Sequence, residues 1–244
     1  NYADVRGAEG NAYARPANQA GSVVDRTLET LQLDSELILQ YDRSFGKFST
    51  HALLGHNYQD QTSSSVQVGS SAVLIPGTYN QDNRTGNLSG GTYKTHARRY
   101  SFFGELTLGY NNYLFATFNG RNESVSLLSP DNRTFFYPGG NVSFVFSDAI
   151  DLLKESHVLS YGKVYASASK TANVSVAPYQ LLNTYVASTG FPYGNLSGFE
   201  ISGTNANYDL RPEFVYSWEV GTQLNFLRNR IRSEVTYASA DARD

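Results

Sequence analysis

The sequence predicts an all-β chain of antiparallel strands, each with one apolar and one polar face, as in part of a large transmembrane β-barrel. Apolar residues recur at every second position in two hairpins, at 101–124 and 218–237. Short turns also alternate along the chain with long polar connections. This asymmetry is typical of an outer-membrane barrel, whose turns are short on the periplasmic side and long outside.

The first 33 residues mix Gly, Ala, Asn and Arg, and they predict a loop or one short strand. The chain opens with Asn1, has no basic-then-apolar leader, and contains no apolar run near the ~18 residues that a membrane helix needs. We therefore expect an internal piece of a longer protein. Barrel strands cross the bilayer with only ~9–11 residues, so the missing apolar run does not argue against a membrane protein.

The first clear hairpin lies between Ser35 and Tyr58. Leu37, Leu39 and Tyr41 alternate with polar residues, a turn follows at 44–46, and a second strand begins at Phe48. Residues 59–96 are then rich in Gln, Ser, Thr, Asn and Gly. They predict a long connection, which is uncommon in a compact domain unless it has a function or is mobile.

The hairpin at 101–124 constrains its own turn. Its apolar positions stay even-numbered on both sides, from Phe102 to Tyr110 and from Leu114 to Phe118. Both sets share one face only if the loop has an odd length, and Asn111–Asn112–Tyr113 with Tyr110 opposite Leu114 satisfies this condition. Asn also tolerates the left-handed conformation that such a turn requires.

The middle of the chain continues the same alternation of strands and connections. Residues 126–137 predict a second long connection, and 142–147 a strand. The segment AIDLLKES at 149–156 predicts one or two helical turns, 159–171 another strand, and 172–212 a third long connection.

The last hairpin shifts its apolar positions from even to odd numbers. These positions run from Trp218 to Phe226 and then from Ile231 to Tyr237. A four-residue loop, Leu227 to Arg230, with Phe226 opposite Ile231 keeps both sets on one face.

The composition argues against several function classes. The net charge is -3 and the Lys and Arg residues are dispersed, so we expect no nucleic-acid partner. No cysteine is present, and His51, His56, His96 and His157 lack metal-ligand spacing. The sequence has no phosphate-binding loop, nucleophile elbow or calcium loop, so we expect no catalytic residue, cofactor or metal.

Two groups of residues are candidates for ligand contact. Charged residues on the polar strand faces would line a hydrated lumen: Glu105, Arg121, Glu123 and Glu219. Aromatic residues of the third connection offer flat rings that stack on sugars, or that pack on a partner or within the loop. The second group is Tyr179, Tyr185, Phe191 and Tyr193.

Several segments together resemble the barrel of SusC-like (SusC/RagA) TonB-dependent transporters of Bacteroidetes. The run YSFFGELTLGYNNYLFATFNGRNES is similar to the family's strand, Y-x-x-x-Y-L turn and R-x-x-S ending. FYPGGNVSFVFSDAI, KVYASASKTAN and LRPEFVYSWEVGTQLNFLRNRIRSEVTYASA resemble later motifs in the expected order. The resemblance covers Ser35 to the end. This chain departs from the family at three positions, where Phe146 replaces the usual Trp, Ala172 the usual Gly and Ala238 the usual Tyr.

This resemblance implies a barrel of about 22 strands with a plugged lumen, of which residues 1–244 would supply about eight to ten. We expect the plug domain, the TonB-binding segment and the closing strands to be missing. The whole protein would import oligosaccharides or oligopeptides across the bacterial outer membrane. Its partners would be a SusD-like surface lipoprotein, TonB and membrane lipid, and the long connections would be extracellular.

Two alternatives from other classes remain open at this point. A soluble all-β carbohydrate-binding domain would bury the alternating apolar face against a second sheet. An outer-membrane β-barrel enzyme would need a Ser/His or carboxylate site, for which His51, His56 and Glu123 are the residues to test.

Overall fold

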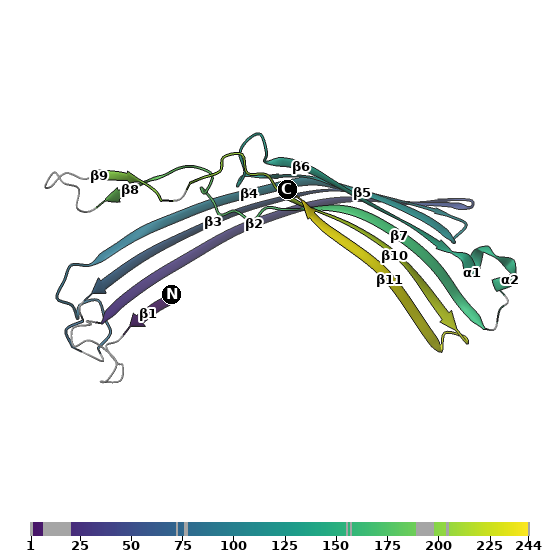
Figure 1. The fold of residues 1–244 in the computed structure, drawn as a ribbon, viewed down its shortest axis with the longest axis horizontal. Coiled ribbons are helices and arrows are strands. Elements are labelled where there is room, and N and C mark those ends of the chain that lie inside the picture. The colour runs from purple at the N-terminus through teal and green to yellow at the C-terminus, as the bar shows by residue number, and fades with distance from the viewer. Residues whose placement is uncertain are drawn as a thin grey trace. The chain divides into compact units, whose positions relative to one another are not determined.

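The computed structural model describes residues 2–6, 21–71, 73–75, 78–154, 156, 158–188, 198–203 and 205–243. Among these residues nine strands form one sheet in the order β1-β2-β3-β4-β5-β6-β7-β10-β11, and β8 and β9 form a separate two-stranded sheet (Figure 1). Strands that follow one another in the chain are therefore neighbours in the sheet, and every pairing with a defined register is antiparallel. The predicted fold class is confirmed.

The strands differ widely in length. Their bounds are β1 Tyr2–Arg6, β2 Ser22–Phe45, β3 Phe48–Ser71, β4 Ser89–Tyr110, β5 Leu114–Val125, β6 Thr134–Val145, β7 Leu159–Asn173, β8 Tyr185–Ser188, β9 Gly198–Ile201, β10 Glu213–Phe226 and β11 Ile231–Arg243. Two helical turns, α1 Phe146–Ala149 and α2 Asp151–Lys154, join β6 to β7. No helix in the described part of the chain is long and apolar enough to span a bilayer.

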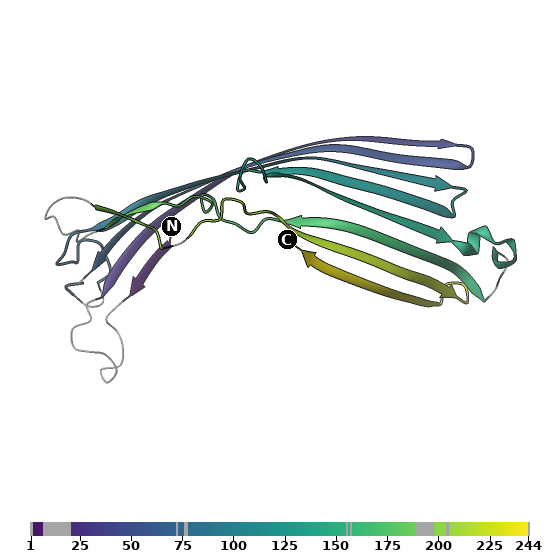
Figure 2. The ribbon, with the colours of Figure 1, turned by 45° about the horizontal axis from the view of Figure 1, so that its top comes forward.

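The chain divides into two compact units. The first holds Asn1–Leu33 and Asp60–Ala97, and the second holds Asp34–Gln59 and Arg98–Asp244. In the first unit β1 pairs with the start of β2, and the connection between β3 and β4 folds around Asn83. The second unit contains the other parts of β2, β3 and β4 and all the strands from β5 onward, and Figure 2 shows β5, β6, β7, β10 and β11 side by side.

The predicted long connection at 59–96 is mostly strand, and that prediction was wrong. β3 continues to Ser71 and β4 begins at Ser89, which leaves 72–88 as the connection. In residues 1–33 the short strand β1 agrees with the prediction, residues 7–20 lie outside the described residues, and the prediction was wrong from Ser22 onward, where β2 begins. Between Val24 and Asp34 neither set of alternate positions is uniformly apolar, so alternation does not reveal the first half of this strand.

Both turn predictions are confirmed. Tyr110 pairs with Leu114 across a three-residue loop, in which Asn111 and Asn112 have φ values of 53° and 60°. Phe226 pairs with Ile231 across the four-residue loop, whose first three residues have φ between 52° and 64°.

The other connections differ from the prediction at their edges. β6 begins at Thr134, so the second connection is 126–133, and β7 extends to Asn173, so the third is 174–212. Of the two helical turns, α2 lies in the segment predicted to be helical, whereas α1 begins at Phe146, inside the predicted strand 142–147. In α2 the Lys154 ammonium donates a hydrogen bond of 2.8 Å to Asp151, which lowers the pKa of that carboxyl.

The sheet of the second unit is a single layer in its described part. Leu106, Leu108, Leu114 and Phe118 are 38%, 43%, 40% and 59% exposed, so no second sheet covers them. Buried apolar side chains gather instead at the far end from the short turns, where Val125, Leu128 and Phe135 pack with Leu210 and other residues of the connections. The connections and the strand ends next to them therefore build this core together.

Candidate ligand-binding site

The register places all four predicted charged residues on one face of the sheet. Residues that are paired directly across antiparallel strands point to the same side. Glu105 pairs with Asn119, and Arg121 and Glu123 follow on the same side of β5. Thr117 of β5 lies on this side too, and it pairs with Asn141 of β6, which pairs with Ser167 of β7. Ser167 pairs with Glu219 of β10, so Glu219 also lies on this side. We call this side the polar face and the opposite side the apolar face.

A buried carboxylate, that of Glu123, is the centre of an ionic cluster on the polar face. Its carboxylate lies 3.3 Å from Nε of Arg99 and 3.1 Å from Nε of Arg121, and it accepts a hydrogen bond of 2.8 Å from the Tyr137 hydroxyl. Glu123 is only 7% exposed, whereas its arginine partners are more open to solvent. Two cations surround one carboxylate, so the Glu123 cluster carries a net positive charge.

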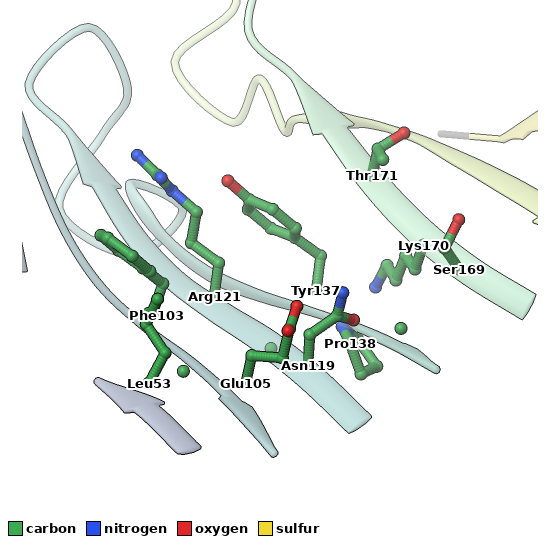
Figure 3. Close-up of a pocket in the computed structure, with 13 residues that line it drawn as sticks. Leu53, Phe103, Glu105, Asn119, Arg121, Tyr137, Pro138, Ser169, Lys170 and Thr171 are labelled. Carbon is green, nitrogen blue, oxygen red and sulfur yellow. The ribbon is translucent and has the colours of Figure 1, made fainter. Parts of the chain in front are cut away.

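A hollow of about 550 Å³ lies beside this cluster, between β3 and β7 (Figure 3). Glu105, Asn119, Arg121 and Tyr137 line it from β4, β5 and β6, and Lys170 lines it from β7. The guanidinium of Arg121 also lies 5.4 Å from the centre of the Phe103 ring, which forms part of the wall. The hollow thus offers a carboxylate, two cations and an amide next to aromatic surface.

Lys170 reaches the hollow because the ladder between β6 and β7 ends just before it. The last pair is Gly139 with Ser169, and the neighbour of Gly139 in the strand is Pro138, which has no N–H to donate. Lys170 extends from β7 toward the β5–β6 side of the hollow (Figure 3). Its Nζ lies 3.6 Å from the centre of the Phe214 ring.

Glu219 belongs to a different part of the polar face and does not line the hollow. It interacts with the Tyr165 hydroxyl, which also bonds Thr236 at 2.7 Å and Glu234 at 3.2 Å. The structure therefore brings Glu105, Arg121 and Glu123 together and leaves Glu219 apart from them.

The aromatic candidates of the third connection lie away from the hollow where the structure describes them. Tyr179 is 60% exposed in a turn with φ of 68°, and Tyr185 is 72% exposed in β8. Phe191 and Tyr193 lie outside the described residues. Ligand contact by these residues stays a prediction.

Five polar residues that line the hollow were not among the sequence candidates: Asn119, Tyr137, Ser169, Lys170 and Thr171. Tyr137 was assigned to a connection, because Pro138 and the two glycines after it obscure strand β6. Lys170 sits at an even position in a strand of small residues, and only the end of the β6–β7 ladder brings it to the hollow.

Two of the histidines pair with carboxylates on the strands. His51 lies 2.6 Å from Asp42, and His96 lies 2.8 Å from Asp60. Within the described ranges no group of three or more His, Asp or Glu side chains is arranged to hold a metal ion. His157 lies outside those ranges.

Comparison with known proteins identifies the family. Residues 1–244 match the family described as TonB dependent receptor-like, beta-barrel. TonB-dependent receptor P3 of Formosa agariphila is 26% identical over 222 residues, which are 86% of this chain and 21% of that protein. TonB-dependent receptor P26 of the same organism is 23% identical over 90% of this chain and 22% of its own length. The chain thus spans about a fifth of these relatives.

Solved structures show the same fold. The RagAB peptide importer in its closed-closed state matches 92% of this chain and 25% of the importer chain, with a TM-score of 0.79 and 19% identity. The open-open state matches 92% of this chain with a TM-score of 0.76 and 20% identity. The family match covers all of residues 1–244, and the meander of antiparallel strands agrees with it. This chain therefore belongs to the TonB-dependent receptor-like β-barrel family.

Proposed function

We propose that this chain is part of the barrel wall of an outer-membrane importer for oligopeptides. The importer works with a surface lipoprotein and is energised through TonB. The apolar face contacts lipid, and the polar face lines the lumen. The connections 72–88, 126–133 and 174–212 lie on the extracellular side.

The observation that carries this proposal is the two-faced single layer. Apolar side chains such as Leu108 and Phe118 are open on one side, while charged and hydroxyl side chains bond one another on the other side. A soluble sheet would leave so much apolar surface in water, whereas a barrel wall presents it to lipid. A soluble carbohydrate-binding sandwich needs a covering sheet that the described residues do not supply.

The hollow favours peptides over neutral sugars as cargo. Every peptide carries amide groups and, when its ends are free, one ammonium and one carboxylate. Glu105 can accept a hydrogen bond from an ammonium, Arg121 can donate to a carboxylate, and Asn119 can both donate to and accept from an amide. The solved barrels of the same fold belong to a peptide importer, which supports this choice.

A lipoprotein lid fits the exposed aromatic and aliphatic residues of the third connection. Tyr185, Phe199 and Ile201 are 72%, 67% and 67% exposed in the β8–β9 hairpin. Two isolated strands are marginally stable in water, so a partner that covers them would stabilise the hairpin. The lipoprotein partner itself follows from the resemblance to SusC-like transporters and is part of this proposal.

The test uses the full-length transporter with its lipoprotein in lipid nanodiscs. Binding of a mixed peptide library and of neutral oligosaccharides is measured by calorimetry for wild type, Glu105→Gln and Asp151→Asn. We expect peptides to bind and Glu105→Gln to weaken them by about tenfold, since it removes one charge-assisted hydrogen bond. Asp151→Asn, the same neutralisation at a short turn, should leave binding unchanged. Equal binding by both variants, or binding of oligosaccharides alone, would contradict the peptide assignment.

A further inference from the structure

A second hollow lies on the apolar face, where β7, β10 and β11 approach the end with the long connections. Its volume is about 620 Å³. Tyr216 and Trp218 supply its aromatic surface, and Lys170 and Arg243 supply cations. We call it the outer groove. It shares Lys170 with the polar-face hollow, because the gap above the last β6–β7 pair opens to both.

The cations of the outer groove lie on either side of one tyrosine. Tyr216 pairs with Lys170 on one side and with Asp241 on the other. The Lys170 Nζ is 5.4 Å and the Arg243 guanidinium carbon 5.8 Å from the centre of the Tyr216 ring. Arg243 also pairs with Asp241 at 2.6 Å, so two cations face one carboxylate and a net positive charge remains.

The position of the groove along the strands matches the far edge of a bilayer. Tyr216 precedes Phe226, at the short turn, by ten residues, and a barrel strand needs ~9–11 residues to cross the hydrocarbon core. On the apolar face between these two levels, the side chains of Trp218 and Val220 are at least 46% exposed. Tyr237 of the neighbouring strand β11 is 66% exposed. The two cations therefore follow directly after an apolar belt of bilayer thickness.

We propose that the outer groove binds the phosphate of a lipid headgroup in the outer leaflet. This inference rests on the proposed function, which turns the apolar face toward lipid. Arg243 offers a planar fork that fits phosphate oxygens, and Lys170 adds a compact charge. Ser239 adds a hydroxyl, and the lipid chain lies along Trp218 and the belt below it.

The strand that continues the sheet would not cover this site. A neighbour pairs with the free edge of β11 in the plane of the sheet, and side chains of the apolar face stay open to the bilayer. Asp241 does not exclude a phosphate, because Arg243 has five N–H donors and the ion pair is 59% to 69% exposed.

The experiment uses full-length transporter in phosphatidylcholine nanodiscs, with lipid binding counted by native mass spectrometry. Three probes are compared: lipid A with its phosphates, the same lipid A after dephosphorylation, and inorganic phosphate. We expect only phosphorylated lipid A to bind tightly. The double variant Lys170→Gln/Arg243→Gln should weaken it by about tenfold or more, and Arg243→Gln alone by severalfold. Lys154→Gln/Arg228→Gln, which removes two cations at the short turns, is the matched control and should bind as wild type does.

The variant Arg243→Gln separates the groove from the polar-face hollow, because Arg243 does not line that hollow. It should keep full peptide affinity. Equal binding of both lipid A forms, or equal loss in the control, would overturn the lipid-phosphate site. Equally tight binding of inorganic phosphate would do the same, since the site would then be a general anion site. A chain that fails to insert into nanodiscs would instead refute the proposed function.

Discussion

The Tyr137 hydroxyl donates a hydrogen bond of 2.8 Å to the Glu123 carboxylate, which lies between Arg99 and Arg121. This contact joins β5 to β6 where the connections pack on the sheet. Tyr137→Phe should lower the free energy of unfolding of the refolded full-length barrel by about 1–2 kcal/mol, because a hydrogen bond to a charged group is lost. Urea unfolding in lipid vesicles measures the change. Tyr100→Phe, at an exposed tyrosine of β4, should change stability by less than about 0.5 kcal/mol.

Removal of the carboxylate should cost more than removal of the hydroxyl. Glu123→Ala leaves two arginines side by side without their shared anion, and we expect a loss of about 2–4 kcal/mol in the same assay. Its effect should shrink in high salt, because the repulsion of the partly exposed arginines is then screened. A loss no larger than that of Tyr137→Phe would show that the Glu123 cluster contributes little.

The orientation of the two faces can be tested with one pair of arginine substitutions. Phe118→Arg puts a charge on the apolar face and should cost about 2–4 kcal/mol if that face meets the bilayer interior. Asn119→Arg, one residue further on, points into the polar-face hollow and should cost less than about 1 kcal/mol. Folding of both variants into vesicles is scored by the heat-dependent shift in gel mobility. Equal costs would contradict the assignment of the faces.

The turn between β4 and β5 depends on two residues in the left-handed conformation. Asn112 has φ of 60°, so Asn112→Val should destabilise the barrel by about 1–2 kcal/mol. Asn112→Gly removes this strain and should stay within about 0.5 kcal/mol of wild type. Equal stability of the two variants in urea would show that the turn can adopt another conformation.

The connection between β3 and β4 is organised by the side chain of Asn83. Its amide donates to the carbonyl oxygens of Ile75 and Thr78 at 2.8 and 2.5 Å, and it accepts from the Ile75 N–H at 2.9 Å. Asn83→Ala should cost this connection about 2–3 kcal/mol, because buried groups lose their partners. Protease should then cut within 72–88 in the folded protein at a higher rate. The exposed Asn87 provides the control, and Asn87→Ala should leave the rate unchanged.

The sequence predicted the turns better than the ends of the strands. Parity across a turn is a local property, so Tyr110 opposite Leu114 and Phe226 opposite Ile231 could be derived from alternation alone. The strand segments at 22–33, 59–71 and 89–96 could not. Their stability comes from backbone hydrogen bonds to neighbouring strands, which do not select side chains by hydrophobicity.

The candidate site was predicted in part for a similar reason. Alternation within β4 and β5 identified the shared side of Glu105, Arg121 and Glu123. It could not show that Glu123 is buried, since this depends on residues of two neighbouring strands. Lys170 was missed because it depends on where the β6–β7 ladder ends, which is a property of the pairing between strands.

The two tight turns also limit how the length of this protein can change. One residue added to the loop at 111–113 would exchange the faces of β5 relative to β4, so Phe118 would enter the lumen and Asn119 would meet lipid. Two added residues would restore both. The connections at 72–88, 126–133 and 174–212 are long enough to accept any number of added residues without changing the faces of the strands that they join. We therefore expect insertions and deletions among relatives to come in pairs at the short turns, and in odd or even numbers alike at the long connections.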